Sequence, residues 1–338
     1  NMNVGMLLAA SGAATAVGLI GYATAPAWAW VVALSFISGL GAGAIDAGLN
    51  TYAAMNYSAR TMNWLHACYG LGAASGPILL TAIIAQGATW QRGYLLVGVG
   101  ELALVVCFLA TLSWWPKSAG AAEPGKDKAQ PIPAASLWST LRVPSVWLGI
   151  ATFFIYTGAE AAVGTWTFTY LTGHHSVPAD QAGSWAGAYW GSLTVGRIAA
   201  GIIASRLSAR ALILSGGWII LLGAVLAVSG LGTAATITRI MCVGFGCAPI
   251  FPSLISTTPA RVPTVHAANA VGFQIAAATL GIALVPSFVG FLARHQGLGV
   301  IPIAWLVAAV ALILLLINLL RFSPHPTKLE TAEATDPV

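Results

Sequence analysis

Long apolar stretches, separated by short polar segments, occupy most of this chain. A helix of roughly 17 to 25 apolar residues is long enough to cross the hydrocarbon core of a bilayer. In lipid, a spanning segment must also satisfy its own backbone hydrogen bonds, as helices do. The sequence therefore predicts an all-α polytopic membrane protein with ten spans, at residues 4–22, 29–54, 63–87, 91–114, 144–171, 182–204, 211–231, 234–256, 266–292 and 299–321.

The composition supports this class. Of the 338 residues 58% are hydrophobic and only 7% are charged, whereas a soluble domain carries roughly a quarter charged residues. Membrane helices use small residues for close packing and tolerate proline, so the 38 glycines and 17 prolines do not argue against helices here. The net charge of +5 is spread over loops and tails, so we expect no nucleic-acid partner.

No pattern typical of an enzyme or a metal site occurs in the sequence. His174 and His175 fall in a predicted loop without other ligand-type neighbours. No nucleophile motif, phosphate loop or dinucleotide fingerprint is placed where catalysis could use it. We therefore expect no enzymatic activity, no cofactor and no bound metal. The cysteines all lie inside apolar stretches and are predicted to pack there without disulfides: Cys68, Cys107, Cys242 and Cys247.

A hydrophilic stretch at 116–142 separates four predicted helices from six. We interpret residues 1–114 as an incomplete N-terminal bundle, 115–143 as a cytoplasmic linker, 144–322 as a six-helix C-terminal bundle and 323–338 as a cytoplasmic tail. Basic residues concentrate in cytoplasmic loops of membrane proteins. With the linker inside, only Arg92 and Arg294 lie outside, so both chain ends are expected in the cytoplasm, at the inner (plasma) membrane. The residues then placed inside are Arg60, Lys117, Lys126, Lys128, Arg142, Arg206, Arg210, Arg261, Arg321 and Lys328.

An internal repeat relates the two predicted bundles at an offset of about 204 residues. Ser11-Gly12 matches Ser215-Gly216, and Gly76 matches Gly281. Gly41-x-Gly43 likewise matches Gly244-x-Gly246. Parallel repeats are typical of one large class of transporters. The predicted helices at 144–171 and 182–204 have no upstream partners, so we expect a twelve-helix protein in which two further helices precede Asn1.

The second predicted helix carries Asp46 and Asn50 among closely spaced glycines, and the third begins with Asn63 and His66. Tyr156, Gly158, Glu160 and Trp166 follow in the fifth. This pattern resembles the major facilitator superfamily, and within it the branch of fucose permease and related sugar–proton symporters. The resemblance implies two pseudo-symmetric helical bundles around a central site.

Two features depart from the family pattern. Asp46 stands where fucose permease has a glutamate. The cytoplasmic signature Gly-x-Leu-x-Asp-Arg-x-Gly-Arg-Arg is matched at Gly201, Ile203, Arg206 and Arg210, whereas its Asp, Gly and first Arg are replaced by Ser205, Ser208 and Ala209.

Asp46, Glu101 and Glu160 lie inside predicted helices. A charge at the bilayer centre costs on the order of 2.5–3.5 kcal/mol, and a carboxyl group escapes this cost by binding a proton. Asp46 and Glu160 are therefore predicted to couple transport to protons. The alternative for Asp46 is a structural hydrogen bond between helices. Glu101 lies on a helix that is peripheral in the superfamily, and its role stays open.

Polar and aromatic side chains within the helices are candidates for holding a solute. Amides and hydroxyl groups match the donors and acceptors of a polyol, and an indole ring suits a sugar face. Each could equally form a hydrogen bond between helices, worth about 1 kcal/mol. Arg197 and Arg239 are interpreted as snorkelling to the membrane surface. The predicted substrate-binding residues are Asn50, Asn63, His66, Tyr156, Trp166, Asn269 and Gln274.

These features predict a monomeric secondary transporter that moves a small polar solute, a sugar in the leading interpretation, by proton-coupled alternating access. Its partners are then the solute, protons and the bilayer. An efflux carrier for drug-like or other organic solutes is the alternative within transport, and would favour a larger and more apolar cavity. A transport-inactive membrane sensor or a membrane-embedded enzyme also stays open, although an enzyme should show paired catalytic residues at one depth.

Overall fold

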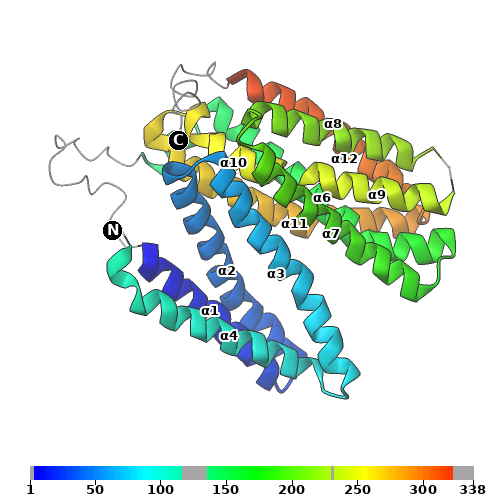
Figure 1. The fold of residues 1–338 in the computed structure, drawn as a ribbon, viewed down its shortest axis with the longest axis horizontal. Helices are drawn as coiled ribbons and strands as arrows, with labels where there is room; N and C mark the ends of the chain where they lie inside the picture. The colour runs from blue at the N-terminus through cyan, green and yellow to red at the C-terminus, as the bar shows by residue number, and fades with distance from the viewer. Residues whose placement is uncertain (1–3, 116–134, 230–231, 323–338) are drawn as a thin grey trace.

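The computed structural model describes residues 4–115, 135–229 and 232–322, which include only the edges of the predicted linker and none of the predicted tail. Regular secondary structure within these residues is entirely helical (Figure 1). The first half contains α1 (Val4–Thr24), α2 (Trp28–Asn56), α3 (Ala59–Ala85) and α4 (Trp90–Ala110). The second half contains α6 (Pro144–His175), α7 (Ala179–Ile203), α8 (Ala209–Ala227), α9 (Thr233–Cys247), α10 (Ile250–Arg261), α11 (Ala267–Gln296) and α12 (Val300–Leu319). Between them lies the one-turn helix α5 (Leu137–Thr140).

Every predicted span overlaps a long helix, but the span predicted at 234–256 is broken into α9 and α10. The break falls at Ala248 and Pro249, where proline lacks the N–H that a continuous helix needs. Within the described residues, eight helices are long and apolar enough to cross a membrane. They include α9 and α10 together as one span, but neither α3 nor α7. The predicted count of ten spans out of twelve therefore stays a prediction.

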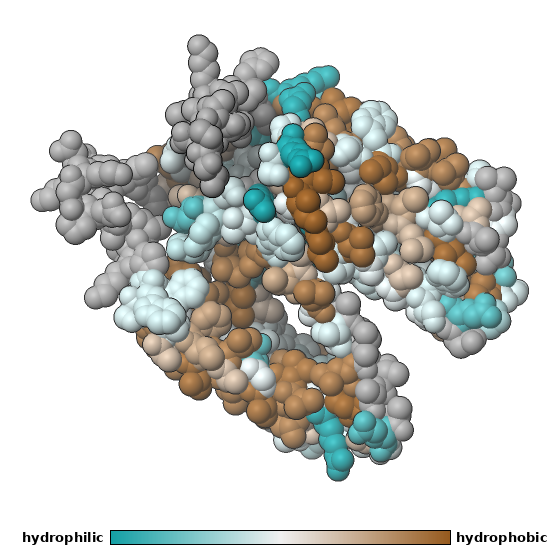
Figure 2. Space-filling view, in the orientation of Figure 1, coloured by the Kyte–Doolittle hydropathy of each residue, from teal (hydrophilic) through white to brown (hydrophobic). Residues whose placement is uncertain are grey.

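The two halves meet at one end of the bundle and separate at the other. We call the end at which α4 stops and α6 starts the linker end, and the opposite end the distal end. At the linker end, α2 and α3 contact α10, α2 also contacts α11, and α3 contacts α7. Ala54 and Met62 of the first half belong to the same buried apolar cluster as Leu254 and Ile255 of α10. At the distal end the halves diverge, and Figure 2 shows an open gap between them.

Two faces of α2 have different surroundings. A Cβ atom added at Gly41 or Gly48 would collide with α1, so these two glycines permit the close packing of α2 on α1. At Gly39 and Gly43 an added Cβ would meet no described atom within 4 Å. Helical periodicity places Gly39 and Gly43 on the same face as Asp46. This face of α2 is therefore open among the described residues.

Candidate functional site

Asp46 is the first member of a series of polar contacts that begins on the open face of α2. Its Oδ1 accepts a hydrogen bond of 2.6 Å from Nδ2 of Asn50, one turn later in the same helix. Oδ1 of Asn50 lies 3.0 Å from Nε2 of His66 in α3. Because the amide nitrogen of Asn50 already donates to Asp46, its oxygen must accept, so the proton of His66 is placed on Nε2. Asn50 and His66 are buried, whereas Asp46 is exposed.

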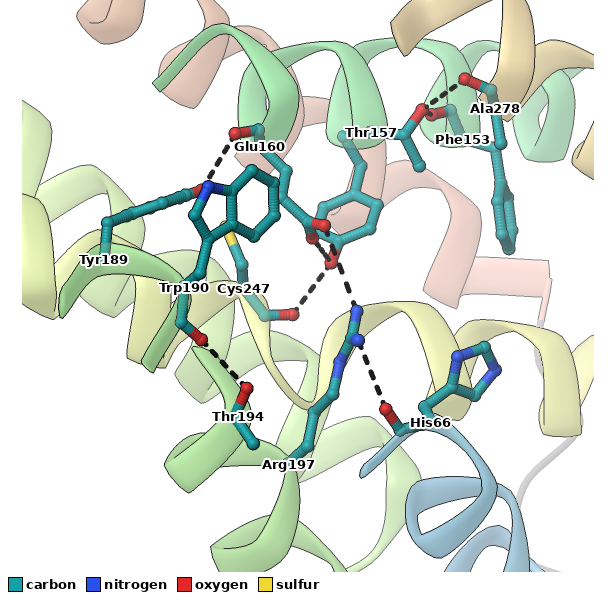
Figure 3. Close-up of polar contacts among 11 residues, drawn as sticks. His66, Phe153, Thr157, Glu160, Tyr189, Trp190, Thr194, Arg197, Cys247 and Ala278 are labelled. Carbon is teal, nitrogen blue, oxygen red and sulfur yellow. Dashed lines mark hydrogen bonds and ion pairs between the residues drawn. The ribbon is translucent and has the colours of Figure 1, made fainter. Parts of the chain in front are cut away.

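Arg197 of α7 lies at the contact between the halves. Its Nη1 donates a hydrogen bond of 3.2 Å to the backbone oxygen of His66, and its Nη2 lies 3.9 Å from Oε1 of Glu160 (Figure 3). The guanidinium carbon is 5.5 Å from the centre of the Tyr69 ring, within the range of a cation–π interaction. Arg197 is only 3% exposed. The prediction that it snorkels to the membrane surface is therefore wrong.

Glu160 of α6 is surrounded by groups of the second half. Its Oε2 accepts a short hydrogen bond from the hydroxyl of Tyr156, one turn earlier. That hydroxyl also lies 2.9 Å from the backbone oxygen of Cys247. Cys247 is the last residue of α9, and carbonyls in the last turn of a helix have no partner within it. The hydroxyl of Tyr189 donates to the backbone oxygen of Glu160 at 2.9 Å, which fixes α7 against α6.

Together these contacts link the two acids predicted to bind protons. They run from Asp46 through Asn50 and His66 to Arg197, and from Arg197 to Glu160. Arg197 is the member that the sequence interpretation left out. A usable signal was present, because a cation inside a membrane helix is expected to pair with an acid, and few acids lie inside the helices.

Other predicted solute-binding residues lie outside this series. Gln274 of α11 is 2% exposed, and its Oε1 accepts from Thr258 of α10 at 2.9 Å. Asn269 donates to the backbone oxygen of Ala135 at 2.8 Å and to Thr140 at 3.1 Å. Asn269 thereby fastens the segment before α6 to the start of α11.

Two more candidates sit on α6 and α3. Trp166 of α6 donates from its indole nitrogen to the backbone oxygen of Pro286 at 2.9 Å, so its ring packs against α11. Asn63 lies in α3, but its side chain is outside the described part of the chain.

The remaining charged residues inside the helices lie apart from this series. Oε1 of Glu101 in α4 is 3.4 Å from the position that a Cβ atom would take at Gly12, which places it at the contact of α4 with α1. Arg239 of α9 is 4% exposed, so the snorkelling interpretation is wrong for it as well. A cluster of three or more His, Cys, Asp or Glu side chains suited to a metal ion is absent from the described residues.

The family is shown by comparison with known proteins. The model of the Major Facilitator Superfamily matches residues 2–274 and 167–337. The chain belongs to the major facilitator superfamily. The predicted family is thereby confirmed, and both family and fold are those of membrane transporters rather than of enzymes.

Individual relatives of this superfamily chain are distant. Bypass of stop codon protein 6 of Saccharomyces cerevisiae is 26% identical over 339 residues, which cover 91% of this chain and 68% of the yeast protein. The structure of the E. coli fucose:proton symporter matches with a TM-score of 0.76 at 13% identity, over 96% of this chain and 85% of the symporter. A human organic anion transporter matches with a TM-score of 0.69 at 16% identity, over 93% and 77% of the two chains. At these identities the two structures show the shared fold alone.

Proposed function

We propose that this protein is a secondary active transporter that moves a small polar solute by proton-coupled alternating access, with a sugar as the leading solute class. The observation that carries the proposal is the series of contacts from Asp46 to Glu160. Two acids that lie within membrane helices are candidates for reversible proton binding. Because the series crosses between the halves, a change of charge at either acid can alter how the halves are held together.

The open face of α2 is proposed to border the solute path. Asp46 is exposed on this face, and Gly39 and Gly43 leave space around it. In alternating access, two bundles rock around a site near the midplane of the membrane. Asp46 supplies acceptors for sugar hydroxyl groups, and Asn50 and His66 orient it. The likeness in fold to the E. coli fucose:proton symporter supports a sugar.

An organic anion is the second candidate solute class. Arg197 is a buried cation beside the proposed path, 3.9 Å from its nearest carboxylate oxygen, and a guanidinium group binds carboxylates in a two-pronged geometry. The likeness in fold to the human organic anion transporter supports this alternative. An anionic solute would bind in competition with Glu160 for Arg197, whereas a sugar would not need the cation.

We also propose that the complete transporter has two further helices ahead of α1, as the sequence repeat predicts. By the repeat, α3 corresponds to α11. A Cβ atom at Gly281 of α11 would meet the backbone oxygen of Phe154 in α6, whereas one at Gly76 of α3 would meet no described atom within 4 Å. An apolar cavity of about 300 Å³ lies at this place, lined by Leu19, Gly76, Leu79, Leu80, Gly93, Tyr94 and Val97. Side chains of a helix corresponding to α6 would fill it.

The proposal includes an orientation in the membrane, with the linker end in the cytoplasm. The distribution of Lys and Arg supports a cytoplasmic linker end. The linker end is the closed end of this structure, so the gap between the halves opens to the outside.

Uptake into proteoliposomes that contain the complete gene product tests the proposal. A panel of sugars and a panel of organic anions would be offered with and without an inward proton gradient. Accumulation of a sugar above its outside concentration, only with the gradient, is the expected result. Gradient-driven uptake of anions alone would replace the sugar by the second candidate. Solute movement that ignores the proton gradient in both panels would contradict proton coupling.

A further inference from the structure

The guanidinium group of Arg197 has partners in both halves of the protein. In its own half it faces the Glu160 carboxylate at 3.9 Å. In the other half it donates to the backbone oxygen of His66 at 3.2 Å and lies over the ring of Tyr69. Its Nε has no hydrogen-bond partner among the described residues. Arg197 therefore joins α7 to α3 while facing the acid on α6.

The two acceptors hold Arg197 in different ways. A separation of 3.9 Å is too long for a hydrogen bond, so Glu160 attracts Arg197 by charge alone. The hydrogen bond goes to His66 in the first half. A charged carboxylate is a stronger acceptor than a backbone carbonyl, and it competes with α3 for the same guanidinium group. A neutral Glu160 competes far less for the guanidinium group. Arg197 is then held mainly by its hydrogen bond to α3.

We propose that Arg197 communicates the charge of Glu160 to the first half and so sets how tightly the halves are held at the linker end. When Glu160 is neutral, Arg197 holds α7 to α3. When Glu160 is charged, it draws the guanidinium group toward α6 and weakens that contact. Arg197 is thus a positioning residue. The inference rests on the proposed function, in which Glu160 binds the transported proton.

Several other titratable or charged groups face Glu160 and belong in any test of this idea. Tyr156 lies on the same helix, Tyr189 on α7, Cys247 on α9 and Tyr69 on α3. His66 and Asp46 lie beyond Arg197 in the same series. A response that belongs to Glu160 must therefore vanish in Glu160→Gln and persist in Asp46→Asn.

The test measures opening at the linker end without measuring transport. Ala54 of α2 is buried in the cluster that closes this end, and Ala54→Cys reports its opening through the rate of maleimide labelling. The full chain would be used in lipid nanodiscs, with alanine replacing the native Cys68, Cys107, Cys242 and Cys247. Typical couplings between sites change an equilibrium by about 5- to 150-fold. We expect Glu160→Gln to slow labelling by about tenfold, toward the lower end of that range, and Arg197→Gln to speed it.

The decisive comparison is a double-mutant cycle. Glu160→Gln should have no effect once Arg197→Gln is present, because the residue that carries the signal is gone. In the protein with both Glu160 and Arg197, the labelling rate of Ala54→Cys is divided by its rate in unfolded protein at the same pH. This ratio should fall as pH falls. The pH dependence should be lost in Glu160→Gln and in Arg197→Gln. Glu101→Gln is the matched control, since Glu101 lies away from the contact, and it should leave the rate unchanged.

An equal effect of Glu160→Gln with and without Arg197 would overturn the inference, as would no effect at all. If Arg197→Gln does not insert into membranes, Arg197→Lys serves in the same cycle. Lysine keeps the positive charge but lacks the planar guanidinium group that reaches two partners at once. Arg197→Lys should therefore reduce the effect of Glu160→Gln. If labelling responds as expected but no proton-driven uptake is found, the proposed function is contradicted and the role of Arg197 is not. If proton-driven uptake is found but labelling does not respond to Glu160→Gln, the role of Arg197 is contradicted and the proposed function is not.

Discussion

Oδ1 of Asn50 in α2 lies 3.0 Å from Nε2 of His66 in α3, and Nδ2 of the same amide donates to Asp46 at 2.6 Å. One amide thus connects an exposed acid to a buried histidine on a different helix. The backbone oxygen of that histidine accepts from Arg197, which belongs to the other half. Changes at Asp46 can therefore reach the second half through two side chains.

Asp46→Asn should abolish gradient-driven accumulation of solute in the complete protein while sparing binding or exchange. Asparagine keeps the size and hydrogen bonding of the side chain but stays neutral, so it cannot bind and release a proton. Uptake against a concentration gradient is the measurement, and Glu101→Gln is the control. Accumulation at the unmodified level in Asp46→Asn would remove Asp46 from the mechanism.

Glu160→Gln should weaken solute binding itself. Tyr156 holds the carboxylate by a hydrogen bond, in a position that we propose to border the solute path. A hydrogen bond to a charged group contributes about 1.5–3 kcal/mol. Its loss therefore corresponds to an increase in Kd of roughly 10- to 150-fold. Titration of the purified protein with the transported solute measures this. Unchanged affinity would show that Glu160 does not contact the solute.

Asn50→Ala should destabilise the fold by about 1 kcal/mol, because Nε2 of His66 is left buried without its partner. The thermal unfolding midpoint in detergent is the measurement. Asn318→Ala is the matched control, since the Asn318 amide donates to a backbone oxygen of its own helix at an exposed position. Equal effects of the two changes would show that the contact between α2 and α3 contributes nothing.

Leucine substitutions at Gly76 and Gly281 test the proposal of two further helices. Gly281→Leu should destabilise the protein by about 1–3 kcal/mol, because α6 leaves no room for a side chain. Gly76→Leu should be neutral in the present chain and costly in the complete protein. Gly100→Leu is the control, since Gly100 too has no described atom near its Cβ position. It should be neutral in both proteins. A neutral Gly76→Leu in the complete protein would contradict a helix at this place.

Single cysteines test the orientation. In intact cells, an impermeant reagent added from outside should label a cysteine at 176–178, the loop between α6 and α7, and should miss one at 116–142. The expectation follows from the excess of Lys and Arg on the linker side. The opposite labelling pattern would invert the topology.

Contacts within a helix could be predicted from the sequence. The Asp46–Asn50 and Tyr156–Glu160 pairs are both four residues apart, and helical periodicity places such residues side by side whatever the rest of the chain does. The division into halves follows in the same way from the length of the apolar stretches and from the hydrophilic segment between them. Membrane helices were predictable because lipid leaves a spanning backbone so few alternatives.

Contacts between helices were decided only by the tertiary structure. The rotation and depth of each helix determine that Arg197 reaches both His66 and Glu160, and that Asn269 fastens the chain before α6. The sequence does not reveal these rotations, because a helix in lipid can be apolar on every face and so carries no amphipathic pattern to orient it. Packing of small residues fixed the rotation of α2 on α1, and it is this rotation that leaves Asp46 on an open face.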